Sequence, residues 1–545
     1  MGETSSRVLE RQSELANLRK QEESAWSDIA RIIRPDDQNF SGMDNTQPPN
    51  DDVWDSTPLY AHDDFVGGLF GESVNPAERW MEFTVEDQEL AKWGPVQSWL
   101  WGEATRIYAS LSPAISTFYS EATSWFADGG AFGNGFIYQE EAPSMDRIVD
   151  QAMPLGQIYI DVDFAGQMNT LSRQFFLSGR QKKARFKDYA GECDEKRRYK
   201  LTHLVEPNPD WKPGKLGTAG MAFTSTYVSE DDRDFEVKGG YYELPYHGLF
   251  WNTQAGRVWA RGPGHLARAD MNMNNEMSRS LLVDAQFSAE PIILTRDDKL
   301  TAAQIRPRAI LSGYINEQGK QLMQFAQRGE NSLRAEDKLK QVRDQIREAF
   351  LFSLWAIVNR PQMTASEFMG WKEEKFRRLG PQLVRVHRGL ASFVARRWRI
   401  LQRAGQTAPP PEELAGKPIA IEMVSPLAKA QKAATGRSVL QWIGSLSDMA
   451  AATGRVEVLD NINFDGSARV LHDAMVGNPD VINDQNMVAQ MRQARAQLQA
   501  QAMQMEQATQ AAGVFADVSH AQQAMTRSQQ RALPAPGANG GGGGR

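Results

Sequence analysis

The sequence predicts an α+β fold that is predominantly α-helical. Near both ends of the chain, apolar residues recur at helical spacing among charged and polar ones. Between these parts, short runs of β-branched and aromatic residues are bounded by glycine and other turn-forming residues, as in strands. Strands that are grouped between blocks of helix favour an α+β arrangement over alternating βαβ units.

Four helices are predicted before the first strand. The first covers residues 6–34 and stops at Pro35, because proline disrupts a continuing helix. The next three cover residues 56–70, 93–111 and 116–127. The glycine-rich residues 129–135 then predict a turn from helix to strand, since glycine adopts backbone conformations that other residues avoid.

Predicted strands follow this turn directly. Residues 136–138, 157–162 and 168–177 have strand-like composition, and Ala165-Gly166 forms a suitable hairpin turn before the third. Further strand-like segments cover residues 201–205, 223–228 and 241–251.

The second half of the chain is again mostly helical. Residues 265–287 contain neither glycine nor proline, and residues 332–358 carry apolar side chains at helical spacing. The segment between them, 289–328, is irregular and contains two prolines and two glycines. Later helices are predicted over residues 364–404 with an interruption at Gly380-Pro381, then over 427–452 and 484–530, with a short strand at 419–424.

The composition is that of an ordinary globular protein with one thiol. The 68 acidic and 61 basic residues give a net charge of −7, unlike the basic charge of proteins that wrap nucleic acid. Cys193 is the only cysteine, which excludes a disulfide within the chain and favours a reducing compartment. No signal peptide and no apolar run of roughly 18 residues is present, so we expect synthesis in a cytoplasm and no membrane contact.

The sequence offers almost no catalytic chemistry. Its seven histidines lack a second ligand at zinc-site spacing, and no GxxxxGK[ST] phosphate loop occurs. The glycines of residues 129–135 stand between a helix and a strand, the reverse of a dinucleotide-binding loop. Asp161 and Asp163 share one strand face and are a candidate carboxylate pair, but no third ligand or base accompanies them. We therefore expect no enzyme activity, no metal and no cofactor.

Two long helices around a broken segment predict a protruding hairpin. Residues 265–287 and 332–358 would form its arms and would bury little surface on their own. Copies of the chain around a ring could supply the missing contacts, because a heterologous interface that closes makes a cyclic oligomer. The alternative is an ordinary antiparallel helix pair inside a globular domain, which periodicity does not exclude.

A strongly basic helix follows the hairpin. Residues 372–403 contain ten lysines and arginines against Glu373 and Glu374. Arginine binds phosphate in a bidentate manner, so this helix could face DNA, or it could pair with acidic faces of neighbouring subunits. The candidates for either role are Arg377, Arg378, Arg385, Arg388, Arg396 and Arg397.

Several short segments carry a resemblance to one known family. In chain order they read WSDIARIIRP at 26–35, DST at 55–57, FGNG at 132–135, RGPG at 261–264, QMTASE at 362–367, LGP at 379–381 and SPLA at 425–428. Together they resemble the head-to-tail connector, or portal, family of T7-like phages (podoviruses). The chain departs from the family at Trp259-Ala260, where tyrosine and glycine are usual. The resemblance covers residues 7–486.

This resemblance implies a portal fold assembled as a ring, expected to be a dodecamer. The wing would comprise residues 1–264 and 359–428, and the stem helices residues 265–287 and 332–358. Residues 288–331 would form the clip, 429–530 the crown and 531–545 a disordered glycine-rich tail. The implied channel loop is Asn359, Arg360, Pro361, Gln362 and Met363, and the implied clip contacts are Arg296, Asp297, Asp298, Lys299, Arg306 and Arg308.

The resemblance also implies a mechanical, non-enzymatic function in the virion. The ring at one capsid vertex would let double-stranded DNA in and out, and would also contact capsid and scaffolding proteins. It would dock the terminase during packaging in the host cytoplasm and tail adaptor or nozzle proteins afterwards. The alternatives are a virion-associated hydrolase that uses Asp161 and Asp163, and another ring-forming head–tail adaptor.

Overall fold

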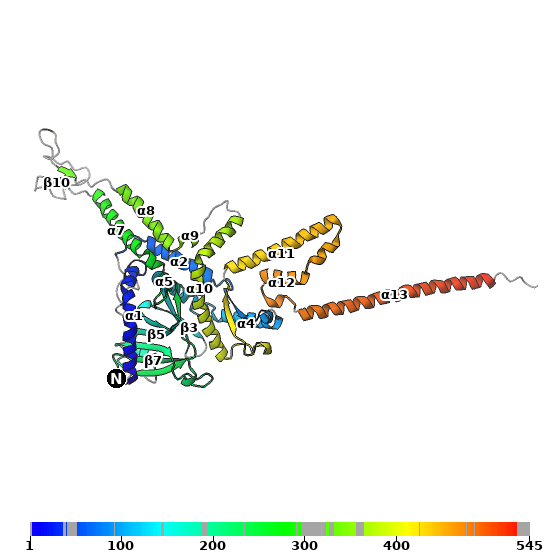
Figure 1. The fold of residues 1–545 in the computed structure, drawn as a ribbon, viewed down its shortest axis with the longest axis horizontal. Helices are drawn as coiled ribbons and strands as arrows, with labels where there is room; N and C mark the ends of the chain where they lie inside the picture. The colour runs from blue at the N-terminus through cyan, green and yellow to red at the C-terminus, as the bar shows by residue number, and fades with distance from the viewer. Residues whose placement is uncertain are drawn as a thin grey trace, which may run out of the picture. The chain divides into compact units, whose positions relative to one another are not determined.

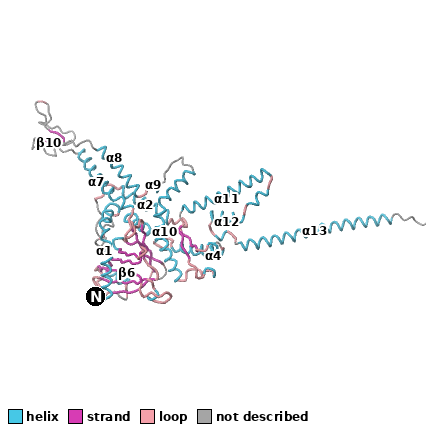
Figure 2. Tube along the Cα trace, in the orientation of Figure 1, coloured by secondary structure: helices cyan, strands magenta, loops and turns pink. Residues whose placement is uncertain are grey.

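The computed structural model confirms the predicted α+β fold class, with helices around a set of strands (Figure 1, Figure 2). Contacts divide the chain into two compact units, Met1–Ser438 and Val439–Arg545. The structure describes residues 3–35, 40, 52–91, 93–142, 147–187, 193–232, 235–289, 293–295, 318, 323–325, 332–355, 365–424, 426–475, 477–483 and 485–530.

The helices of the first unit largely follow the predicted ranges. The first of them, α1 (Glu3–Ile33), buries Leu15, Trp26 and Ile29 against the rest of the unit. The others are α2 (Thr57–Ser73), α3 (Gln88–Ala91), α4 (Gly94–Ser110), α5 (Phe118–Phe132), α6 (Gly179–Arg185), α7 (Pro263–Ala289), α8 (Ser332–Ala349), α9 (Phe352–Trp355) and α10 (Ala365–Arg403). The next helix, α11 (Pro426–Thr453), crosses the boundary between the two units.

The described strands form antiparallel sheets. The strands of the two larger sheets come from the middle of the chain. The larger has the order β4-β5-β6-β7-β8, and the smaller has the order β3-β2-β9. The first contains β4 (Ile158–Val162), β5 (Met168–Ser178), β6 (Arg198–Pro207), β7 (Phe223–Ser229) and β8 (Glu236–Tyr241). The second contains β2 (Asn134–Glu141), β3 (Ile148–Met153) and β9 (Tyr246–Phe250). Two further pairs join β1 (Met81–Val85) to β12 (Ile419–Met423) and β10 (Ile293–Thr295) to β11 (Met323–Phe325).

A buried arginine connects α1 to the larger sheet. Arg19 is 1% exposed and donates to the carbonyl oxygens of Gly156 at 2.8 Å and Ile158 at 2.9 Å. It also donates to the Phe40 carbonyl at 2.7 Å, and its guanidinium lies 3.8 Å from the centre of the Tyr159 ring. A buried charge needs such a complete set of acceptors, so α1 is an integral part of this unit.

Two glycine-rich segments cross at close range where α5 ends and α7 begins. Gly133 follows α5 with a left-handed φ of 75°. A Cβ atom on Gly262 would lie 2.6 Å from the Gly133 nitrogen and 2.9 Å from the Gly129 oxygen. The Asn134 side chain closes the crossing, because it donates to the Ala260 oxygen and accepts from the Ala260 nitrogen, both at 2.9 Å. The crossing therefore has room for backbone only.

Two predicted helix boundaries are wrong. The helix α5 continues to Phe132, so Gly129 and Gly130 lie in its last turn and not in the predicted turn. The helix α10 runs through Gly380-Pro381 without the predicted interruption. Leu379 and Leu383 are buried on either side of this proline, and burial of that face outweighs the one backbone hydrogen bond that proline cannot make.

The predicted helix over residues 332–358 is divided into α8 and α9. Leu351 separates them with a φ of 60°, which is unusual for a residue other than glycine. Phe350 and Leu354 on either side are buried, so packing of these two side chains holds the turn in place. The rest of that predicted range lies outside the described residues.

The second unit consists mainly of helices. α12 (Phe464–Met475) was not predicted, whereas α13 (Gln485–Gln530) follows the predicted range closely. Arg492 of α13 donates to both carboxylate oxygens of Asp465 in α12, at 2.7 and 2.6 Å. This exposed bidentate pair links the two helices.

We predict that Gly133→Ala is far more destabilising than Gly166→Ala. Both glycines have a left-handed φ, 75° and 73°, which costs an alanine about 1–2 kcal/mol. A Cβ at Gly133 also meets the Arg261 backbone, whereas a Cβ at Gly166 meets nothing within 4 Å. Urea unfolding should show a loss of roughly 3 kcal/mol or more for Gly133→Ala. Equal losses for the two variants would contradict the described crossing.

Candidate functional site

The basic helix α10 lies against the smaller sheet with its apolar face buried. Val386, Leu390 and Phe393 are fully buried at helical spacing. A Cβ on Gly389 would lie 2.8 Å from the Gly248 oxygen in β9, so glycine lets the helix approach the strand closely. This packing determines which arginines of α10 point inward and which point out.

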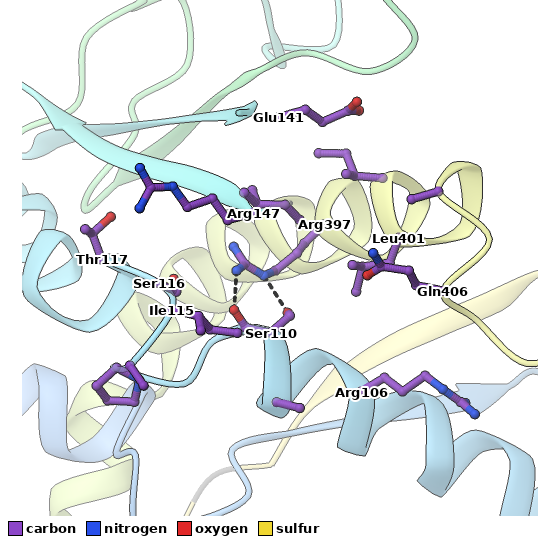
Figure 3. Close-up of a pocket in the computed structure, with 16 residues that line it drawn as sticks. Arg106, Ser110, Ile115, Ser116, Thr117, Glu141, Arg147, Arg397, Leu401 and Gln406 are labelled. Carbon is purple, nitrogen blue, oxygen red and sulfur yellow. Dashed lines mark hydrogen bonds between the residues drawn. The ribbon is translucent and has the colours of Figure 1, made fainter. Parts of the chain in front are cut away.

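Arg397 points inward and forms a buried ion pair. It donates to the two Asp150 carboxylate oxygens at 3.1 and 2.8 Å, and both side chains are almost fully buried. It also donates to the hydroxyl and carbonyl oxygens of Ser110 at 2.7 and 2.6 Å, as Figure 3 shows. Asp150 in β3 accepts a further bond from the Ser116 hydroxyl. The Arg397 charge thus joins α10 to β3 and to the end of α4.

Arg396 also points inward, and it shares a carboxylate with two other arginines. It donates to the carbonyl oxygen of Glu243 at 2.7 Å, and the Glu243 carboxylate lies within 4 Å of Arg396, Arg399 and Arg403. Burial lowers the pKa of Arg396, and the Glu243 charge opposes that shift. Burial, aided by the Arg396 charge, lowers the pKa of His247 to about 3 and keeps this imidazole neutral.

The other four predicted arginines lie nearer the surface. Arg378 is 3.7 Å from Glu348 of α8 and, like Arg377, is exposed. Arg385 donates to the Trp251 carbonyl at 3.0 Å and to the Asn252 side chain, and Arg388 donates to the Gln167 side chain at 3.5 Å. Across the described parts of the chain, neither Arg385 nor Arg388 is paired with a carboxylate.

The prediction for the basic helix therefore needs correction at two positions. Arg396 and Arg397 bind acidic groups of their own chain and are 4% and 1% exposed, so they are not available to DNA or to a neighbouring subunit. The remaining candidates for those roles are Arg377, Arg378, Arg385 and Arg388. Sequence reasoning missed the partners Asp150 and Glu243, because nothing near them along the chain links them to α10.

Two pockets flank α10. One of about 680 Å³ lies at its C-terminal end and is lined in part by Ile115, Arg147 and Leu401 (Figure 3). The other, of about 940 Å³, lies beside the middle of the helix and includes Arg385 and Arg388. Both contain arginine, and the second also contains Ser392, whose hydroxyl lies 2.9 Å from Nδ1 of His247. That hydroxyl donates to the Gly389 carbonyl oxygen of its own helix at 2.9 Å.

Asp161 and Asp163 have structural partners. Arg11 of α1 donates to Asp161 at 2.6 Å, and a β-bulge lies between Asp161 and Val162. Asp163 accepts from the backbone nitrogens of Ala165 and Gln167, both at 2.8 Å, and so closes the hairpin turn. Within the described ranges no group of three or more His, Cys, Asp or Glu could hold a metal ion. Nor is any described helix long and apolar enough to cross a membrane.

The helices α7 and α8 pair and project from the first unit (Figure 1). One carboxylate, that of Asp55, joins the two helices. One Asp55 oxygen accepts from Ser278 of α7 at 2.9 Å and lies 2.7 Å from Arg343 of α8. Its other oxygen accepts from the Thr57 backbone at 2.8 Å. Burial would raise the pKa of Asp55, but these hydrogen bonds lower it to about 2, so the carboxylate stays charged.

Two sets of predicted residues lie outside the described residues. The first is the candidate channel loop, Asn359, Arg360, Pro361, Gln362 and Met363. The second is the candidate clip contacts, Arg296, Asp297, Asp298, Lys299, Arg306 and Arg308.

Comparison with known proteins decides the family. The family model described as "Bacteriophage head to tail connecting protein" matches residues 5–482. The chain belongs to this family. It is 26% identical over 526 residues to the portal protein of Salmonella phage epsilon15. This alignment covers 92% of this chain and 93% of that protein. It is also 26% identical over 519 residues to the probable portal protein of Bordetella phage BPP-1, with 91% and 92% covered.

Three of the segments that resemble the head to tail connecting family occupy structural junctions in the described part of the chain. FGNG and RGPG are the two sides of the glycine crossing between α5 and α7. DST supplies Asp55 and Thr57, which hold α7 and α8. The motifs that identified this connector are thus backbone crossings and anchors, and the family resemblance predicted from them is confirmed.

We predict that Arg397→Met and Arg399→Met have very different effects on folding, since Arg399 is half-exposed. Removing one partner of a buried ion pair costs about 3–5 kcal/mol because the other charge stays buried. A surface substitution usually costs less than about 0.5 kcal/mol. Urea unfolding at fixed protein concentration should separate the two variants of this helix. Similar unfolding midpoints would show that the Arg397–Asp150 pair does not stabilise the fold.

Proposed function

We propose that this chain is the subunit of a portal ring at one capsid vertex, through which double-stranded DNA is packaged and ejected. The observation that carries the proposal is similarity over more than nine-tenths of the chain to two phage portal proteins. The matching family model, which covers residues 5–482, spans the paired helices α7 and α8 that leave the first unit as a projection. A closed ring of identical subunits, expected to be a dodecamer, provides a hole without sequence preference.

In this proposal each part of the chain has a separate mechanical role. Residues 1–264 and 359–428 form the wing, and α7 and α8 form the stem within residues 265–287 and 332–358. The clip, residues 288–331, faces the terminase during packaging and tail adaptor or nozzle proteins afterwards. The small pair β10–β11 lies inside that range. Capsid and scaffolding proteins would contact the outside of the ring in the assembling virion.

The crown proposal rests on an apolar stripe along α13. Met487, Met491, Leu498 and Met505 are exposed and recur at intervals of four and seven residues. Side chains at that spacing face one partner helix in a coiled coil. We expect residues 429–530 of neighbouring subunits to pack through this stripe around the DNA.

The DNA path itself would carry few fixed contacts. Arg377 and Arg378 are exposed and, with the candidate loop at residues 359–363, are the positions that we propose near the DNA. Weak phosphate contacts suit a duplex that must slide, and the net charge of −7 agrees with that requirement. The energy for movement would come from the terminase, because the chain lacks a phosphate-binding loop.

Neither alternative function has a specific observation in its favour. A hydrolase would need Asp161 and Asp163, but these carboxylates bind Arg11 and the backbone of their own turn. A shorter ring-forming adaptor would not need the projection in which α7 pairs with α8. The portal function accounts for both features.

We predict that the purified full-length chain forms rings with a central opening. Negative-stain electron microscopy and light scattering should show closed particles of one dominant subunit number. The chain should hydrolyse neither ATP nor DNA under the same conditions. Particles that stay monomeric at every concentration would overturn the portal proposal.

We also predict that reversing three positive charges in the clip weakens the binding of the ring to the terminase. The triple change R296E, R306E and R308E should leave ring formation intact and weaken binding of the phage's own terminase by roughly tenfold or more. Surface plasmon resonance on immobilised rings measures this effect. The matched control is R180E, R197E and R198E in the wing, which should bind terminase as the unchanged ring does. Equal weakening by both triple variants would count against a clip-specific contact.

A further inference from the structure

The pocket beside the middle of α10 carries positive charge that its own chain does not balance. Its lining includes five arginines and two carboxylates, Asp163 and Glu243. Three of the arginines have partners, because Arg257 binds Glu22 while Arg396 and Arg399 share Glu243. The other two are Arg385 and Arg388, which bind only neutral oxygens among the described residues.

The same pocket exposes apolar side chains. Phe164, at the tip of the β4–β5 hairpin, is fully exposed, and Val384 of α10 is 66% exposed. A protein rarely leaves a phenylalanine entirely in water at a pocket rim, so such a rim indicates a contact surface. A DNA backbone is a poor occupant, because these apolar groups and the carboxylates of Asp163 and Glu243 do not attract phosphate. A protein segment with carboxylates and an aromatic ring fits better.

The helix α2 presents such a surface. Tyr60, Asp63, Asp64, Gly67 and Gly71 are exposed and fall on one stripe, because their spacing repeats at three and four residues. Neither Asp63 nor Asp64 has a cationic partner in the part of the chain that the structure describes. A Cβ on Gly67 or Gly71 would meet nothing within 4 Å, so the helix backbone itself is open to a neighbour. Tyr60, 66% exposed, supplies the aromatic ring.

From these two surfaces we infer that α2 of one subunit docks in the α10 pocket of the next. Asp63 and Asp64 would face Arg385 and Arg388, and Tyr60 would pack near Phe164 and Val384. Two different surfaces on one chain that complement each other make a heterologous contact, and the proposed ring requires a contact of this kind whose rotation closes. This inference rests on the proposed ring and assigns its subunit contact.

Charge reversal tests the contact directly. Asp64→Arg and Arg388→Glu should each lower the fraction of chain in rings by roughly tenfold, because each places like charges opposite one another. The double variant should restore rings to within about twofold of the unchanged chain, since the reversed pair attracts again. Sedimentation velocity measures the ring fraction, and circular dichroism checks that each variant is folded.

Cysteine crosslinking gives an independent readout if a charge variant fails to fold. In a Cys193→Ser background, Asp64→Cys with Arg388→Cys should form a ladder of covalent oligomers with a short bismaleimide. The control pair Asp64→Cys and Arg180→Cys, with Arg180 also exposed but outside the pocket, should give no ladder.

The outcomes separate this inference from the portal proposal. Rings from the unchanged chain, without rescue by the double variant and without a ladder, overturn the α2–α10 contact alone. Absence of rings from the unchanged chain overturns both.

Discussion

The structure depends on one backbone crossing between the end of α5 and the start of α7. There, Gly133 and Gly262 approach so closely that neither could carry a side chain, and Asn134 joins the two segments through Ala260. The crossing links the smaller sheet, which begins at β2, to the first helix of the projection. Because the two segments are 126 residues apart along the chain, this junction closes a loop that contains the smaller and the larger sheet.

Long helices could be predicted from the sequence, whereas their ends and several strands could not. The ranges of α1, α7 and α13 follow from apolar spacing and the absence of breaking residues. Pro381 led to the wrong prediction of a helix interruption. Burial of the apolar side chains on both sides of it outweighs the tendency of proline to break a helix. β3 and β8 were missed because the polar residues within IVDQAM and EVKGGY hide their strand character, which neighbouring strands then supply.

In the candidate site too, the sequence shows the local pattern of charge but not the distant partner of each residue. Ten basic residues identify α10 as charged, but they do not show which of its arginines are buried. Arg397 is paired with Asp150, 247 positions away, and Arg396 with Glu243, 153 positions away. Only the folded chain brings these groups together. Among the described residues, Arg385 and Arg388 have no such carboxylate partner. We propose that their charge serves to bind a neighbouring subunit.

Asp55 connects both helices of the projection to the body through one side chain. Ser278 and Arg343 bind the same carboxylate oxygen, so α7 and α8 cannot shift past each other without breaking a shared bond. A force applied to the far end of the helix pair therefore loads both arms together, because this shared carboxylate couples them beside the body.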